Sequence, residues 1–141
     1  MPDWDPKEFE DAVIEDMRAH GGAVTTGPLA GDPLLLMTSM GARTGEPRRA
    51  LLTFSRDGDA YVVAGTAGGS PTEPSWLHNL RANPEVTVEA ENRVFRARAS
   101  RAGGADRDQL WEEHVVALPK FAPYPEQSGR VIPMVRLAPL E

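Results

Sequence analysis

From residue 34 onward the sequence alternates short apolar segments with turn-forming residues, and this pattern constrains the fold more than any other feature. Phe95, Ala97 and Ala99 alternate with polar residues, as expected of a strand with one buried face. Asp57-Gly58-Asp59 and Glu91-Asn92 are typical of tight turns between antiparallel strands. We expect about six strands, at residues 34–40, 51–55, 61–64, 86–90, 95–100 and 131–137. The pattern predicts an α+β fold around a mainly antiparallel sheet that closes into a barrel.

Helices are expected before, between and after these strands. Phe9, Val13 and Met17 repeat at a spacing of four and form one apolar stripe, which predicts a first helix over about 6–20. Further helices are expected at 74–82 and 106–117, with a proline-containing loop at 118–129. The chain has 141 residues, which suits one domain spanning 1–141 and is too short for two.

The composition excludes several classes of protein. A net charge of −6 argues against general nucleic-acid binding. Cysteine is absent, and His20, His78 and His114 lack the spacing of metal ligands, so no metal site is expected. The longest strongly apolar run, at 34–37, is far shorter than the roughly 20 residues of a membrane span. The acidic segment 1–20 does not resemble a secretory signal, and we expect a cytoplasmic protein without a transmembrane segment.

Residues 41–49, Gly-Ala-Arg-Thr-Gly-Glu-Pro-Arg-Arg, combine a glycine-containing turn with a cluster of arginines. Backbone N–H groups, the Thr44 hydroxyl and the guanidinium groups of Arg43, Arg48 and Arg49 suit a phosphate or a carboxylate. The stretch is neither a Walker loop nor a dinucleotide fingerprint. Taken alone, it fits a solvated hairpin with surface arginines better than an anion site.

A second stretch of interest begins where the third predicted strand ends. Gly65-Thr66-Ala67-Gly68-Gly69 leads toward the helix predicted at 74–82. Glycines let a ligand approach the backbone, and a helix N-terminus suits an anion. Trp76 can form a wall beside a flat ring. On spacing alone, however, Trp76 and Leu80 are the buried face of a short helix.

Taken together, the two stretches resemble the deazaflavin-dependent nitroreductase family of actinobacteria. The shared order is an apolar strand, a Gly-x-Arg-Thr-Gly-x-Pro-Arg turn, a second apolar strand, a Gly-Gly stretch and a Pro-x-Trp-x-x-Asn-Leu-x-Ala-Asn-Pro segment, here at 74–84. The similarity runs from the first predicted helix to the Arg130-Val131-Ile132-Pro133 segment. It implies a split β-barrel related to flavin-binding barrels.

The resemblance also implies an activity. Reduced coenzyme F(420), an 8-hydroxy-5-deazaflavin, would pass a hydride to an electron-poor small molecule such as a quinone, an activated alkene or a nitro compound. The coenzyme supplies the reactivity and the protein supplies position and electrostatics. An FMN-dependent oxidoreductase on the same barrel and a non-catalytic binder of the deazaflavin or of a quinone remain the alternatives. Homodimer formation and peripheral membrane contact also stay open.

By motif position, the resemblance assigns binding residues. It implies that Arg43, Thr44 and Arg48 hold the phosphate and glutamate tail of the coenzyme. The rest of the coenzyme site would be formed by Arg49, Ala50, Leu51, Leu52, Thr53, Ala64, Gly65, Thr66, Ser75, Trp76, Leu77, His78 and Asn79. A proton for the reduced acceptor would come from Thr66, from Tyr124 or from water.

The chain departs from the family pattern in three places. Ala42 and Ala67 stand where the family often carries a base, so we expect fewer cations around the tail. The late loop carries Leu118, Phe121 and Tyr124 where the family is often rich in tyrosine. We therefore expect a more apolar acceptor wall with a single phenol.

Overall fold

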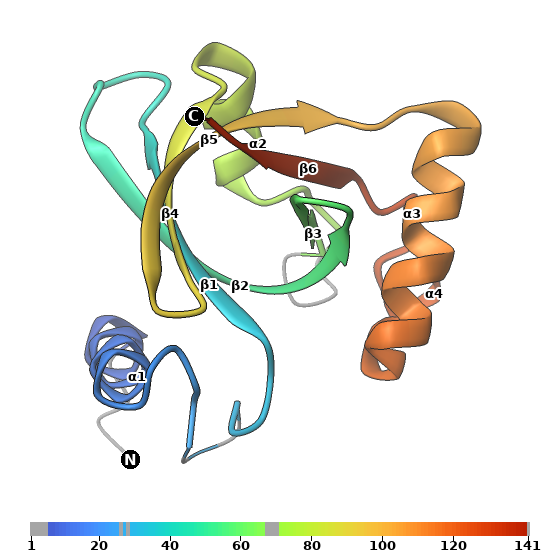
Figure 1. Cartoon of the computed structure of the whole chain (residues 1–141). Helices are drawn as coiled ribbons and strands as arrows, with labels where there is room; N and C mark the ends of the chain where they lie inside the picture. The colour runs from blue at the N-terminus through green and yellow to red at the C-terminus, as the bar shows by residue number, and fades with distance from the viewer. Residues whose placement is uncertain (1–5, 26, 28, 67–70, 141) are drawn as a thin grey trace, which may run out of the picture.

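The computed structural model describes residues 6–25, 27, 29–66 and 71–140. Within these residues, six strands close into a barrel whose neighbouring strands are all antiparallel (Figure 1). The order around the barrel is β1 (Leu34–Met40), β2 (Pro47–Asp57), β3 (Ala60–Ala64), β6 (Met134–Pro139), β5 (Arg93–Arg101) and β4 (Glu85–Ala90). The predicted α+β class and the closed antiparallel barrel are confirmed.

β2 is longer than predicted. The sequence placed its start at residue 51, but the strand begins at Pro47. β1 pairs with it along its whole length, up to Met40 opposite Pro47. Consequently Arg48 and Arg49 belong to the sheet and not to the preceding turn, and the ladder fixes where both project.

β6 is shorter than predicted and begins at Met134 instead of residue 131. Pro133 has no N–H to give to a ladder. The carbonyl of Ile132 accepts a hydrogen bond from Arg107 Nε at 2.9 Å, so a side chain takes the place of a neighbouring strand. The segment before β6 is therefore held by side-chain and loop contacts.

The segment 118–129, predicted as a loop, contains two short helices. These are η2 (Pro119–Phe121) and α4 (Tyr124–Ser128). Pro119 and Pro125 lie in their first turns, where the missing N–H leaves no intrahelical hydrogen bond unmade. The prolines that suggested a loop instead begin helices.

Three longer helices of the described chain match their predicted positions to within about two residues. They are α1 (Pro6–Ala19), α2 (Ser75–Ala82) and α3 (Gly104–Ala117). α3 packs outside the barrel against β2, β3 and β6, and α2 packs against β1 (Figure 1). No helix in the described ranges is long and apolar enough to cross a membrane.

The barrel interior forms the main core. Its fully buried members include Leu35, Met37, Val63, Val86, Val88, Val135 and Leu137. Along β2 the side chains alternate: Ala50, Leu52 and Phe54 pack against this core, whereas Leu51 packs on the other side against the apolar stripe of α1. One strand thus links the core to the N-terminal helix.

A second core lies outside the barrel, under α3. Val62 and Met134, on β3 and β6, pack there with Leu110 of α3 and Phe121 of η2. Because these two strands face the barrel interior on one side and α3 on the other, both of their faces are buried. This layer fixes the late helices against the barrel.

His114, on α3, is fully buried beside this second core. Its Nδ1 shares a hydrogen bond of 2.7 Å with the Ser55 hydroxyl on β2, and its ring meets Phe121 edge-on at a centroid distance of 4.7 Å. Burial lowers the pKa of His114 to about 4, because the imidazolium would lose its hydration. The folded protein therefore holds this ring neutral.

Stability should consequently depend on pH through His114. In the unfolded chain the pKa of His114 is about 6.5, so the unfolded chain binds the proton at a higher pH than the folded protein does. The stabilisation of the fold that comes from the neutral ring is therefore complete above pH 6.5, and it is lost as the pH falls toward the folded-state pKa. We expect this group to lower the free energy of unfolding by about 2 kcal/mol between pH 7.5 and pH 5. Urea unfolding at both pH values measures it against His114→Gln. Identical pH dependence in the two proteins would contradict the prediction.

Candidate functional site

A basic hollow of about 290 Å³ lies between the turn after β1 and the start of α2. It is lined by Gly41, Ala42, Arg43, Thr44, Arg48, Arg49, Ala50, Ser75, Trp76 and Asn79. The turn contributes two of these residues with polar side chains, β2 contributes two arginines, and α2 presents its first turn. The hollow therefore joins positive charge to a helix N-terminus, which is suited to an anion.

The turn at 41–46 is closed by its own backbone. Gly41 N donates to Glu46 O at 2.7 Å, and Gly45 N donates to Gly41 O at 2.9 Å. Gly45 has a φ of 71°, a left-handed conformation that favours glycine. Thr44 Oγ1 accepts from Glu46 N at 3.2 Å, so its own O–H can donate to a ligand.

Asn79 fastens this turn to α2. Ala42 N donates to Asn79 Oδ1 at 3.0 Å, across 37 positions of the sequence. The resemblance placed Asn79 among the coenzyme's contacts, and the structure gives its side-chain oxygen to the turn. Asn79 thus positions the segment that carries Arg43 and Thr44.

The three arginines of the basic hollow differ in their partners. Arg49 forms ion pairs with two carboxylates of α1. Arg48 approaches Glu46 only at 4.0 Å. Arg43 has no ion-pair partner among the residues that the structure describes. Arg43 and Arg48 can therefore engage an anion without breaking a close ion pair.

An aromatic hollow of about 360 Å³ lies further along β2. It is lined by Leu29, Leu51, Leu52, Thr53, Ala64, Thr66, Trp76, Lys120, Phe121 and Tyr124. Trp76 and Phe121 give it flat apolar walls, and the Phe121 and Tyr124 rings meet edge-on at a centroid distance of 5.4 Å. The hydroxyls of Thr66 and Tyr124 supply polar groups in this apolar space.

The two hollows form one elongated site. Trp76 lines both of them. β2 runs beneath both: residues 48–50 line the basic hollow and residues 51–53 line the aromatic one. The site is therefore cationic at one end and lined mainly by aromatic and aliphatic side chains at the other.

The end of β3 is fixed next to this site by a side chain from the late segment. Arg130 Nη2 donates to the carbonyls of Thr66 at 3.1 Å and Thr72 at 3.2 Å. These bonds hold the backbone at Thr66, a residue that lines the aromatic hollow.

Most residues assigned from the resemblance line the two hollows. They are Arg43, Thr44, Arg48, Arg49, Ala50, Leu51, Leu52, Thr53, Ala64, Thr66, Ser75, Trp76, Asn79 and Tyr124. Leu77 instead packs in the barrel core, and His78 is exposed on α2. A Cβ at Gly65 would lie 2.9 Å from Leu77 Cδ1, so this glycine permits close packing of α2 on the end of β3. Residues 67–70, with Ala67 and Gly68-Gly69, lie outside the described residues.

Three residues depart from the sequence-based expectation. Leu29 and Lys120 also line the aromatic hollow, and Lys120 pairs with Asp32. Leu118, expected at the acceptor wall, packs in the core under α3, whereas Phe121 packs there and also lines the aromatic hollow. Leu29 carried no sequence signal, because it lies in an irregular segment whose position depends on the packing of α1.

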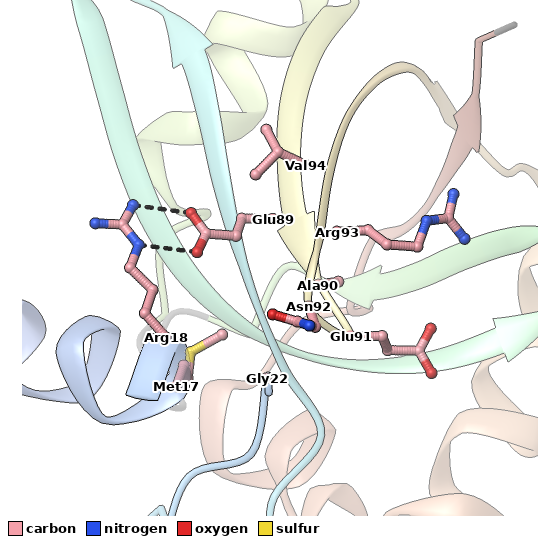
Figure 2. A pocket seen from close by; sticks show the side chains of 9 residues that line it. All are labelled: Met17, Arg18, Gly22, Glu89, Ala90, Glu91, Asn92, Arg93 and Val94. Carbon is pink, nitrogen blue, oxygen red and sulfur yellow. Dashed lines mark hydrogen bonds and ion pairs between the residues drawn. The ribbon is translucent and has the colours of Figure 1, made fainter. Parts of the chain in front are cut away.

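A smaller hollow lies between the end of α1 and the β4–β5 turn (Figure 2). Arg18 and Glu89 border it and are joined by hydrogen bonds of 2.9 and 2.8 Å. Its volume of about 80 Å³ is far below the roughly 300–1,000 Å³ of small-molecule sites. We place the candidate site in the basic and aromatic hollows because together they combine guanidinium groups with aromatic walls.

Comparison with known proteins decides the family. A family model described as F(420)H(2)-dependent quinone reductase matches residues 11–139. The chain belongs to this family. An F(420)H(2)-dependent quinone reductase of Mycobacterium tuberculosis is 37% identical over 108 residues, which cover 74% of this chain and 72% of that protein. The predicted deazaflavin family is confirmed, and its name specifies quinone reduction.

Solved structures agree with this assignment. A structure titled as an F(420)-H2 dependent reductase has a TM-score of 0.68 and 32% identity, and covers 74% of this chain and 93% of its own. Another, titled as a domain-swapped dimer, has a TM-score of 0.70 and 28% identity, and covers 94% of this chain and 99% of its own. The predicted split-barrel fold is confirmed.

The role of Asn79 can be tested by substitution. We expect Asn79→Leu to weaken F(420) binding about fivefold, since a neutral hydrogen bond contributes about 1 kcal/mol and its loss loosens the basic turn. Fluorescence titration measures the affinity. Asn83→Leu makes the same change at the exposed C-terminal end of α2, outside both hollows; it is the matched control and should bind like the wild type. Unchanged affinity in Asn79→Leu would rule out the bracing role.

Proposed function

We propose that this chain transfers a hydride from reduced coenzyme F(420) to a quinone, with the coenzyme held along β2. The observation that carries the proposal is the joined site: a basic hollow and an aromatic hollow that share Trp76. The basic hollow takes the anionic tail of the coenzyme. The aromatic hollow takes the flat ring and the acceptor.

The residues present fit such a coenzyme. The tail carries a phosphodiester and glutamate carboxylates, which Arg43 and Arg48 can bind through charge-assisted hydrogen bonds. The ring is flat and apolar over most of its surface, like the walls formed by Trp76 and Phe121. The two hollows together fall within the size range of small-molecule sites.

The protein's part in the reaction is position and proton supply. When bound, reduced F(420) supplies the hydride. The apolar walls of the aromatic hollow exclude water and hold a quinone close to the ring. The quinone then needs one proton to become a hydroquinone, and Thr66 and Tyr124, which both carry a hydroxyl, line this hollow. Either hydroxyl, or a water that it orients, can deliver that proton.

Turnover tests the proposed function directly. Reduced F(420) and menadione should react at a rate that depends on the concentration of the protein, as followed by the return of oxidised coenzyme under anaerobic conditions. NADPH in place of reduced F(420) should support no turnover, because the chain lacks a dinucleotide fingerprint. Tight binding of FMN without binding of F(420) would favour the flavin alternative. Coenzyme binding without turnover would favour a non-catalytic binder.

Arg48 should be essential for tail binding. With Ala42 and Ala67 at positions where the family often has bases, each remaining arginine carries more of the interaction. We expect Arg48→Ala to weaken F(420) binding at least about tenfold, or about 1.4 kcal/mol. The loss should shrink at high salt and disappear with a tail-free deazaflavin.

The control for this variant is Arg98→Ala, which removes an exposed arginine of β5 outside both hollows. Fluorescence titration of both variants with full-length and tail-free coenzyme separates the possibilities. Equal losses with both coenzyme forms in Arg48→Ala would remove Arg48 from the tail site.

The acceptor wall should favour quinones over bulky bicyclic nitro compounds. Phe121 gives this wall an apolar surface, and Tyr124 is the phenol that lines it among the described residues. A wall with one phenol offers fewer phenolic hydrogen bonds to a large polar acceptor than the tyrosine-rich wall that is common in the family. Steady-state kinetics with both classes should give a higher kcat/KM for quinones. Comparable values would indicate that the wall does not discriminate between them.

Location and assembly are further parts of the proposal. We place the protein in the cytoplasm and expect it to form a homodimer. A relative solved as a domain-swapped dimer supports self-association. Light scattering on the purified protein measures the mass in solution.

A further inference from the structure

The acidic N-terminal helix lies beside the basic hollow. Arg49 Nη2 is 2.8 Å from Asp11 Oδ1 and 3.2 Å from Glu10 Oε1. The same arginine lines the basic hollow. A single arginine side chain therefore contacts α1 and lines the place proposed for the coenzyme's tail.

The strand geometry explains this double position. Residues two apart on a strand share a face. Leu51, two residues after Arg49, packs against the apolar stripe of α1. Arg49 thus leaves β2 on the face that α1 covers, and its side chain also lines the basic hollow. About a third of its side chain remains exposed, so a ligand can reach it.

Other contacts hold α1 in place without Arg49. Val13 and Met17 are buried in a cluster with the start of β1. At the opposite end of the helix, Arg18 donates two hydrogen bonds to Glu89 of β4, at 2.9 and 2.8 Å (Figure 2). The Arg49 pairs can therefore be exchanged for a ligand while the helix stays docked.

We propose that Glu10 and Asp11 compete with the anionic tail of the coenzyme for Arg49, and so set the affinity of the tail site. The inference rests on the proposed function and names two determinants of affinity that lie outside both hollows. Both carboxylates contact Nη2 of Arg49 and lower the attraction that its guanidinium group offers the tail, whereas Arg43 and Arg48 have no close carboxylate partner among the described residues. By linkage, a bound tail weakens the hold of α1 on Arg49 by the same factor.

The test is a gain of affinity, which damage to the fold does not produce. We expect Asp11→Asn to tighten F(420) binding about threefold, as the loss of one exposed ion pair predicts. Binding of a tail-free deazaflavin should not change. Glu10→Gln should act in the same direction and serves as a second variant if Asp11→Asn is poorly folded by thermal unfolding.

Two controls isolate the exchange. Glu15→Gln makes the same change of charge at an exposed position one turn further along α1, and should leave the affinity at its wild-type value. In an Arg49→Gln background, Asp11→Asn should no longer tighten binding, because the shared partner is gone.

Each outcome of these titrations supports or overturns the competition for Arg49. Unchanged affinity in both Asp11→Asn and Glu10→Gln would overturn the competition, as would a gain of equal size in Glu15→Gln or in the Arg49→Gln background. If the wild type binds F(420) but these variants behave like it, the proposed function stands and this inference alone fails. If the wild type binds no F(420), both fail.

Discussion

The pairing of β1 with β2 is the interaction on which the site depends. All seven residues of β1 are paired, from Leu34 opposite Thr53 to Met40 opposite Pro47. This register sets which side chains of β2 face the barrel core and which face α1. A slip of one residue would exchange the two faces. It would turn Arg49 away from α1 and place Leu51 in the barrel core.

α2 joins the basic hollow to the aromatic hollow, as β2 does. Its buried face, with Trp76 and Leu80, packs into the barrel core. Trp76 at the same time lines both hollows, and Asn79 holds the basic turn. The buried-face interpretation of Trp76 is confirmed, and the same side chain also lines both hollows, because a tryptophan is large enough to pack with one edge and present another. Core packing and site geometry are coupled through this one helix.

The local charge of the basic hollow is opposite in sign to the net charge of the chain. The net charge is −6, yet the basic hollow contains three arginines. An acidic surface repels anions in general, while a local cluster of guanidinium groups with backbone N–H donors recognises one anion by geometry. α1 contributes to the acidic part and contacts Arg49 directly. The helix belongs to the electrostatics of the site as well as to the scaffold.

Much of the fold, and the family, could be predicted from local sequence signals. Period-two patterning and turn residues predicted the six strands, and the joint motif around Arg43 and Trp76 predicted the family, because these signals depend on nearest neighbours and on residue type. The start of β2 and the end of the late loop were predicted less well. The arginines at 48 and 49 are typical of a solvated turn, but strand pairing places them in β2. The prolines at 119 and 125 are typical of a loop, but they occupy the first turns of two short helices.

The sequence by itself determined the elements, the barrel class and the residue types of the site, since each of these follows from patterns within short stretches. Tertiary structure alone decided three features: the use of Asn79 to brace the turn, the place of Leu29 in the aromatic hollow, and the pairing of Arg49 with α1. The polar contacts among them join residues 37 to 39 positions apart. Their partners are chosen by barrel closure and strand register, and no local pattern carries that information.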